Sequence, residues 1–359
     1  MLIYIMLYII GLLSVFYANH IYSNRTIEEK RKKASFFCFF CFALLLALRH
    51  QSMGTDLRVD ETYGYLGMYD TIAKTSWIKV ITGSFLNYEK GYVIYNKLLS
   101  VLSKNRQLLL IATAFLSVLP VAKMIGKTSE SPEQSFFIFM GIPLVLLYYS
   151  GLRQVIAMAL CFVSIKNIQN KKLAKFIIKV LIASLFHSTA LVFLPAYFIY
   201  RINITNKYRF ITLGALAVIY LFRNQLLQLL AKLTRRTVEI EDTGSFLLFI
   251  FFILIYLFCV LVGKNTKEHT GYMNLFFGAC VFQAFSGINS IIMRIGFYYM
   301  IFLVLLLPET ISKLSNGTTR TVLNTLLFLS FTLFGLYLLN GPSYAMSNPY
   351  YFFWQVIPK

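Results

Sequence analysis

Six ionisable side chains lie at the ends of apolar segments, where they could act on a charged substrate. They are Arg49, Asp56, Glu89, Arg153, His187 and Arg294. An ionisable group in or beside a membrane segment is expensive to leave unpaired, so it marks a candidate site by default. Arginine binds phosphate through two parallel hydrogen bonds, which a lysine cannot reproduce. The arginines in this set therefore predict contact with a phosphate group.

Each of these residue types also has an ordinary structural explanation. An arginine at a helix end can be an anchor whose charged head reaches the membrane surface. His187, between Phe186 and Ser188, can cap a helix end, and Asp56 can hold the turn that Gly54 begins. A nearby tyrosine cluster predicts an aromatic belt at the membrane boundary: Tyr63, Tyr65 and Tyr69. None of these explanations accounts for so many ionisable groups on one predicted side.

The composition is that of a membrane protein. Hydrophobic residues make up 58% of the chain, and the mean hydropathy is +0.67. Charged residues make up 13%, whereas soluble domains contain about 25%. We therefore predict an all-α, polytopic helical membrane protein with about 10–12 transmembrane or half-membrane helices. Residues 1–359 are expected to form a single integral membrane domain.

The basic run TIEEKRKKAS after the first apolar segment sets the expected topology. Short loops rich in Lys and Arg stay in the cytoplasm, so the N-terminus is predicted to be external. The next helix, about residues 35–48, then runs outward to LRHQSMGTDLRVDETY at residues 48–63. An external segment of interfacial amphipathic helices is expected at about residues 49–106. A second external loop is expected at about 223–245, and the C-terminus is also predicted to be external.

The apolar stretch 174–200 is basic at both ends, which one transmembrane helix cannot reconcile with the positive-inside rule. Two short helices that meet at LFHST, residues 185–189, satisfy the rule, because both outer ends then face the cytoplasm. We favour this hairpin over a single long helix. Broken helices of this kind are tolerated where the turn lines a polar cavity.

The charges differ in type between the two predicted sides. Internal loops are rich in Lys, whereas the external side carries a surplus of Arg: Arg49, Arg58, Arg153, Arg223, Arg235, Arg236 and Arg294. The net charge of +20 is first explained by topology, so no nucleic-acid partner is expected. Cys38 and Cys41 form a CxxC pair without a second pair or a nearby His, so no metal site is expected. Gly-rich phosphate loops are absent, and no cofactor is expected.

An ordered series of short motifs resembles a known family. The series is "LRHQSMGTD", "NYEKGY", "GLRQVIAMAL", "LIASLFHSTALVFLP" and "MRIGFYYMIFLVLLLP", over about residues 1–310. It looks like the EpsG/Wzy-type polysaccharide polymerases, which are bacterial integral membrane proteins of O-antigen, capsule and exopolysaccharide assembly. The match is looser after Asp56, where LRVDET precedes Tyr63. Either Asp56 or Asp60 is therefore the counterpart of the family's aspartate.

The resemblance implies a membrane glycosyltransferase in the bacterial cytoplasmic membrane that acts at the outer leaflet. Such an enzyme joins undecaprenyl-pyrophosphate-linked oligosaccharides, with membrane lipid and a chain-length regulator protein as further candidate partners. The pyrophosphate leaving group needs positive charge, which Arg49, Arg153 and Arg294 are expected to supply, with Arg235 and Arg236 as loop candidates. The acceptor hydroxyl needs a base, for which the candidates are Asp56, Glu89 and His187.

Three other functions compete with this interpretation. A flippase for the same lipid-linked unit should line its interior with charge, whereas here Lys179 is the main charge in mid-helix. A ligase that moves finished glycan to another acceptor would share the same sequence features. A membrane acyltransferase would need an acidic partner next to a buried His, and the surroundings of His187 lack an HxxxD-type motif.

Overall fold

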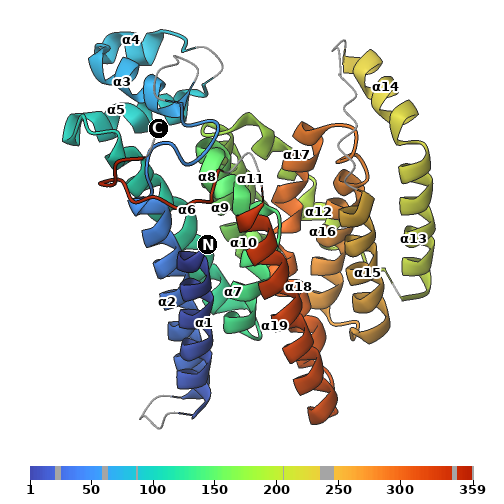
Figure 1. The fold of residues 1–359 in the computed structure, drawn as a ribbon. Helices are drawn as coiled ribbons and strands as arrows, with labels where there is room; N and C mark the ends of the chain where they lie inside the picture. The colour runs from blue at the N-terminus through green and yellow to red at the C-terminus, as the bar shows by residue number, and fades with distance from the viewer. Residues whose placement is uncertain are drawn as a thin grey trace. The chain divides into compact units, whose positions relative to one another are not determined.

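The computed structural model describes residues 1–20, 26–58, 64–85, 88–204, 206–234, 246–341 and 346–357. Within these ranges the chain is helical, apart from one isolated antiparallel bridge between Arg49 and Phe352. The helices group into two compact units, Met1–Leu194 with Asn324–Lys359, and Pro195–Leu323. The predicted all-α fold is confirmed (Figure 1). This division does not test the predicted single membrane domain, which stays a prediction.

The first unit contains the N-terminal helices and most of the last one. In chain order they are α1 (Leu2–His20), α2 (Ile27–Leu48), α3 (Tyr65–Lys74), α4 (Trp77–Thr82), α5 (Lys90–Leu102), α6 (Gln107–Thr128), α7 (Pro132–Met140), α8 (Leu144–Ser150), α9 (Leu152–Val163), α10 (Ile165–Gln169), α11 (Leu173–Ser184), the 3-10 helix η1 (Ser188–Phe193) and α19 (Gly317–Asn340). Helix α2 packs against α1, α6 and α7, and α9 packs against α6 and α11. These helices surround the core of the unit.

The second unit contains the remaining helices. They are α12 (Ala196–Ile199), α13 (Asn206–Leu221), α14 (Arg223–Thr234), α15 (Phe246–Val262), α16 (Lys267–Gln283), α17 (Ser290–Met300) and α18 (Leu303–Ser312). Helix α16 packs against α15, α17 and α18 and is therefore central to this unit. The predicted external loop at 223–245 begins as helix α14, and residues 235–245 lie outside the described part of the chain.

Several helices are long and apolar enough to cross a membrane. Helices α6 and α19 satisfy both criteria, and three bent pairs raise the number to as many as five within the described ranges. The pairs are α7 with α8, bent by 67°, residues 208–229 in α13 and α14, bent by 72°, and α17 with α18, bent by 41°. Shorter apolar helices are also present, such as α15. The bent pairs have the broken form that the predicted half-membrane helices require, and the helix set is consistent with a multi-pass membrane protein.

Basic residues gather at one end of the first unit. Helix α2 begins there with the hydroxyl of Thr26, which accepts a hydrogen bond from the amide of Glu29. The Arg31 guanidinium lies 3.4 Å from Glu133 at the start of α7. The side chain of Lys32 lies near Gly126 in the last turn of α6. The loops predicted to share the cytoplasmic side are thus neighbours in space.

The opposite end of the first unit carries the short helices after α2. Figure 1 shows α3, α4 and α5 beyond the C-terminal end of α2. The predicted helical character of residues 49–106 is confirmed over the described part of that range. Tyr92 of α5 is buried, whereas Leu98 and Leu102 are exposed. Helix α5 therefore has one apolar face in the core and another at the surface.

The predicted break within residues 174–200 is also present. Helix α11 ends at Ser184 and η1 begins at Ser188. The Phe176 and Phe193 ring centroids are 5.9 Å apart, whereas 17 residues of a continuous helix would separate them by roughly 25 Å. The chain therefore reverses direction at Leu185–His187, as the hairpin requires.

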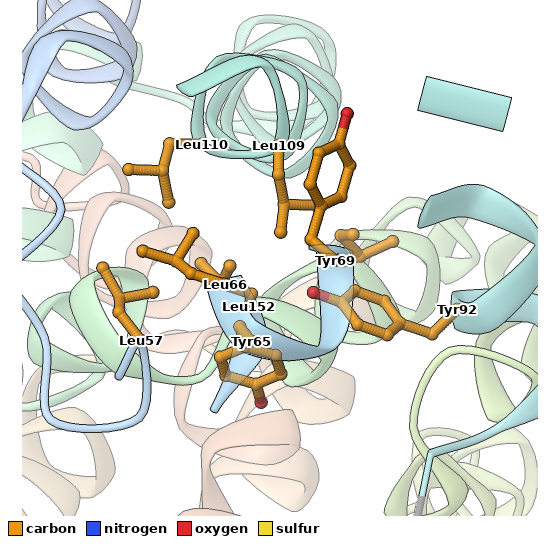
Figure 2. Packing of buried hydrophobic residues seen from close by; sticks show 9 residues of the cluster. Leu57, Tyr65, Leu66, Tyr69, Tyr92, Leu109, Leu110 and Leu152 are labelled. Carbon is orange, nitrogen blue, oxygen red and sulfur yellow. The ribbon is translucent and has the colours of Figure 1, made fainter. Parts of the chain in front are cut away.

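A hydrophobic cluster joins the elements at the α3–α5 end of the unit. Its buried members come from the 49–58 loop and from α3, α5, α6 and α9: Leu57, Tyr65, Leu66, Tyr69, Tyr92, Leu109, Leu110, Leu152 and Ile156. Figure 2 shows the labelled members of the cluster meeting from the loop and from the separate helices. Leu152 precedes Arg153 in the chain, and Tyr65 lies close to Arg153 in space. This core therefore fixes the position of Arg153.

Candidate functional site

Glu89 is the centre of a polar cluster in the first unit. Its Oε2 lies 2.6 Å from Nη1 of Arg153, and its Oε1 accepts a 2.8 Å hydrogen bond from the backbone amide of Ser188. Nδ1 of His187 lies 3.3 Å from the same Oε1. The side chains of all three ionisable residues are about four-fifths buried, with exposed fractions between 16% and 21%. Three residues predicted separately from sequence are thus brought into one site.

The position of Glu89 depends on contact between α5 and the break after α11. The amide of Tyr92 donates a 3.1 Å hydrogen bond to the carbonyl of Leu185. Gly91 makes this approach feasible, because a Cβ there would lie 2.7 Å from both Cβ and O of Leu185. The first turn of α5 therefore lies directly against the break, where Glu89 meets His187 and Ser188.

The position of Arg153 depends on a second break, at Gly151 between α8 and α9. Arg153 lies in the first turn of α9, where its guanidinium carbon is 4.5 Å from the Tyr88 ring centroid and 5.7 Å from that of Tyr65. Its Nε also donates a 3.5 Å hydrogen bond to the Tyr65 hydroxyl. These rings cover the guanidinium and hold its plane, which adds cation–π attraction to the ion pair.

The electrostatics of the cluster favour an ionised Glu89. Burial alone raises the pKa of a carboxyl group. The His187 imidazole, a hydrogen bond from the Ser188 amide and the charge of Arg153 outweigh burial, so the pKa of Glu89 is lowered to about 2. Burial raises the pKa of Tyr88, which keeps its hydroxyl neutral. Glu89 is therefore a weak base that is well suited to orient a neighbouring group.

His187 does not cap the helix that follows it. It stands at the N-cap position of η1 without a side-chain capping hydrogen bond. Glu89 supplies that cap instead, through the amide of Ser188. The imidazole is consequently held beside a carboxylate, with Nδ1 3.3 Å from Oε1 of Glu89.

Asp56 lies in the turn that the sequence indicated. The amide of Leu57 donates to the carbonyl of Gly54 at 3.1 Å, and the Thr55 hydroxyl lies 3.4 Å from Oδ1 of Asp56. The backbone carbonyl of Asp56 accepts a hydrogen bond from Tyr65 at the start of α3. The Asp56 charge also raises the pKa of Tyr88, after larger effects of burial and Tyr65. The backbone of Asp56 thus contacts Tyr65 of the cluster, and Asp60 lies outside the described residues.

Arg49 is directed into the fold. Its Nη1 and Nη2 donate hydrogen bonds of 2.9 and 3.1 Å to the carbonyls of Tyr148 and Tyr149, and the residue is 1% exposed. These carbonyls end helix α8, where the helix dipole favours positive charge. Gly54 packs against the same Tyr149 carbonyl with φ +125°, a backbone conformation that favours glycine. Arg49 is thus bound to the end of α8, and its role in pyrophosphate binding stays a prediction.

The other three predicted arginines lie outside the described residues of the first unit. Arg294 is partly buried in α17 of the second unit. Arg235 and Arg236 lie outside the described residues. Their predicted contacts with pyrophosphate stay predictions.

Sequence reasoning missed the aromatic part of the site. Tyr65 was assigned with Tyr69 to an aromatic belt, and this prediction is wrong for both, because they are 6% and 0% exposed. Tyr63 lies outside the described residues. Tyr88 was overlooked, although its place directly before Glu89 in NYEKGY was a usable signal.

The cluster offers a cation, an anion and a titratable imidazole at one end of a helical unit. In the described ranges, no group of three His, Cys, Asp or Glu residues is arranged to hold a metal ion. The arrangement can hold an anionic group near Arg153 and exchange a proton at His187. Group transfer from a phosphorylated donor requires both of these functions.

Comparison with known proteins gives one result. A model of the EpsG family matches residues 32–353, which include every residue of the cluster. No curated protein and no solved structure matches the chain. The match extends over most of the sequence, and the chain therefore belongs to the EpsG family, which is associated with exopolysaccharide biosynthesis.

Proposed function

We propose that this protein is a glycosyltransferase that joins lipid-linked oligosaccharide repeat units into a long surface polysaccharide. The observation that carries the proposal is the convergence of Arg153, Glu89 and His187 at one end of the first unit. Family membership supports a role in polysaccharide assembly. The donor is a growing glycan on undecaprenyl pyrophosphate, and the acceptor is the non-reducing sugar of a fresh lipid-linked unit.

In the proposed reaction, His187 is the general base. A proton on Nδ1, shared with Glu89, leaves Nε2 to take the proton from the acceptor hydroxyl. The hydroxyl oxygen then bonds to the anomeric carbon of the donor, and the bond from that carbon to the pyrophosphate oxygen breaks. The electron pair leaves with undecaprenyl pyrophosphate, whose developing charge Arg153 stabilises. Glu89 holds both partners, because its low pKa makes it a poor base but a durable anion.

The proposed location is the bacterial cytoplasmic membrane, with the site at the outer leaflet. The basic loops gather at the opposite end of the first unit from α3–α5. Under the positive-inside rule that basic end faces the cytoplasm, which leaves the site external. A lipid-linked substrate fits a site at such a boundary.

Deletion of the gene, followed by electrophoresis of the surface glycan, tests the proposed function. A polymerase defect leaves a single repeat unit on its carrier or core, whereas a flippase defect leaves no repeat unit at the surface. An unchanged ladder of glycan lengths would contradict the proposal.

Complementation of the deletion with point variants tests the residues. Arg153→Ala and Arg294→Ala are expected to abolish chain elongation when elongation is normalised to the amount of protein in the membrane. A normal ladder from either variant removes that arginine from the proposed machinery.

A further inference from the structure

A furrow runs between α1 and α2 along most of their length. On α1, its lining residues recur at spacings of three and four: Ile3, Met6, Ile10, Leu13 and Tyr17. Residues with these spacings lie on one face of a helix. Two cavities of about 670 and 450 Å³ share Ile10, so they adjoin on this face.

Helix α2 forms the opposite wall with the same spacing. Its lining residues include Ala34, Phe37, Cys41, Leu44 and Leu48. Two facing apolar stripes at this spacing would be expected to interdigitate and fill the space between them. Here the cavities remain between helices that pack against each other.

The length of the furrow identifies what fits it. Fourteen residues separate Ile3 from Tyr17 on α1, which is roughly 21 Å of helix axis at 1.5 Å per residue. One leaflet of a bilayer supplies only about 15 Å of the roughly 30 Å hydrocarbon core. The furrow is therefore longer than the depth of one leaflet, and it suits a chain that extends past the bilayer midplane.

One end of the furrow lies at Leu48, where the loop between α2 and α3 begins. There the C-terminal tail contributes Tyr350, Phe352 and Gln355 to the lining. The backbone of Phe352 bridges Arg49, the residue after Leu48. The loop that starts at this point reaches the Tyr149 carbonyl at Gly54 and continues to Asp56, whose backbone carbonyl accepts a hydrogen bond from the amide of Tyr65, one of the tyrosines that cover Arg153. A lipid whose chain lies in the furrow would present its phosphate end toward this loop.

We propose that the furrow between α1 and α2 binds the polyprenyl chain of the lipid-linked substrate, with the phosphate end at the tail-lined mouth. This proposal rests on the proposed function for the identity of the lipid. It adds a specific chain-binding site on helices that contribute none of the residues of the Glu89 cluster. The apolar lining supplies the affinity, since each buried methylene adds to the transfer free energy from water.

Photo-crosslinking of the full-length protein tests this site. The photoreactive residue benzoylphenylalanine replaces Leu44 or Leu13, and the protein is placed in phosphatidylethanolamine–phosphatidylglycerol vesicles. The probes are radiolabelled undecaprenyl phosphate and the much shorter geranyl phosphate. Matched controls carry the same residue at Leu12, next to Leu13 on α1, and at Phe36 on α2, which are both exposed and outside the lining.

The expected pattern depends on chain length. Position 44, near the mouth, should be labelled by both probes, whereas position 13, an exposed position farther from the mouth along the furrow, should be labelled only by undecaprenyl phosphate. Unlabelled undecaprenyl phosphate should remove the signal, and added phosphatidylglycerol should not. Equal labelling at positions 12 and 36, or equal competition by phosphatidylglycerol, would show ordinary lipid contact and overturn the proposal.

The outcome is separable from that of the proposed function. Selective labelling in a protein whose deletion leaves the glycan ladder unchanged would support the furrow and contradict the polymerase. A polymerase phenotype together with unselective labelling would support the polymerase and contradict the furrow. Gel filtration of each variant confirms that the labelled protein is folded.

Discussion

At the scale of the residue, the ion pair between Glu89 and Arg153 dominates the candidate site. The two side chains are 16% and 17% exposed, so solvent screens their attraction less than it would at the surface. Removing one member of such a pair leaves a largely buried charge without its partner, which is more damaging than removing both. The contribution of the pair to the stability of the fold can therefore be separated from its contribution to chain elongation.

Single and double variants of the pair make that separation. Arg153→Ala alone should lower the free energy of unfolding by on the order of 3 kcal/mol, because Glu89 loses its charge partner. The double variant Glu89→Ala with Arg153→Ala should recover much of that stability but not chain elongation, which should stay reduced at least about 100-fold. Thermal unfolding in detergent and glycan gels measure the two properties. Elongation that returns together with stability would assign the pair a purely structural role.

The pH dependence of stability gives an independent test of Glu89. Its pKa is about 2 in the folded protein against 4.5 as the reference value. The ionised Glu89 carboxylate, held by His187, the Ser188 amide and Arg153, therefore contributes stability above pH 4.5, and this contribution is lost as the pH falls through 4.5 toward 2.

The comparison variant for this test is Glu89→Gln, which cannot ionise at position 89. The wild-type protein should lose more stability than this variant between pH 5 and pH 3, as measured by thermal unfolding. Identical pH profiles would contradict the low pKa of Glu89.

At the scale of the element, breaks between helices create the site. Arg153 follows the break at Gly151, and His187 lies in the break between α11 and η1. A break exposes backbone groups that a continuous helix would satisfy, and Glu89 satisfies one of them, the amide of Ser188. The close contact of α5 with this break therefore joins three elements in one site.

Replacement of Gly91 tests that contact. Gly91→Ala introduces a Cβ that would lie 2.7 Å from backbone and side-chain atoms of Leu185, so α5 must move away from the break. We expect elongation to fall at least about tenfold, because a displacement near 1 Å in a catalytic site is enough to do so. The glycan ladder measures the effect.

Gly126→Ala is the matched control, since its nearest neighbour would be Lys32 Cγ at 3.9 Å, an ordinary contact. This helix-interior change should leave elongation unaltered. Equal effects of the two substitutions would show that α5 does not depend on close contact with the break.

At the scale of the whole molecule, the distribution of charge and of chain ends gives the first unit two distinct ends. The hydroxyl of Tyr4 donates to the carbonyl of Ser347, and the amide of Phe353 donates to the carbonyl of Leu48. The beginning of α1, the end of α2 and the C-terminal tail therefore lie together, as expected if all three are on one side of a membrane. The basic start of α2 lies at the other end, where Arg31 contacts Glu133 at the start of α7.

Cysteine labelling in cells tests this sidedness. In a cysteine-free background, Lys74→Cys should react with a membrane-impermeant reagent from outside. Asn203→Cys and Thr318→Cys should react only after the membrane is opened. All three positions are exposed. External labelling of Asn203→Cys would contradict the predicted hairpin topology.

Much of this protein was predictable from the sequence. Composition alone identified a helical membrane protein, because apolar stretches of this length cannot be buried in a soluble domain of the same size. The two basic ends of residues 174–200 predicted a reversal of the chain, which the contact between Phe176 and Phe193 confirms. Ordered short motifs identified the EpsG family.

The tertiary structure decided which ionisable residues meet. Arg153 and His187 are 64 and 98 residues from Glu89 along the chain, and no local pattern encodes contacts over such separations. Arg49 and Arg153 looked equivalent as arginines at helix ends, yet α8 carbonyls bind one and Glu89 pairs with the other. The direction of a side chain depends on what packs around it, so the sequence determined which groups were present and the fold determined their partners.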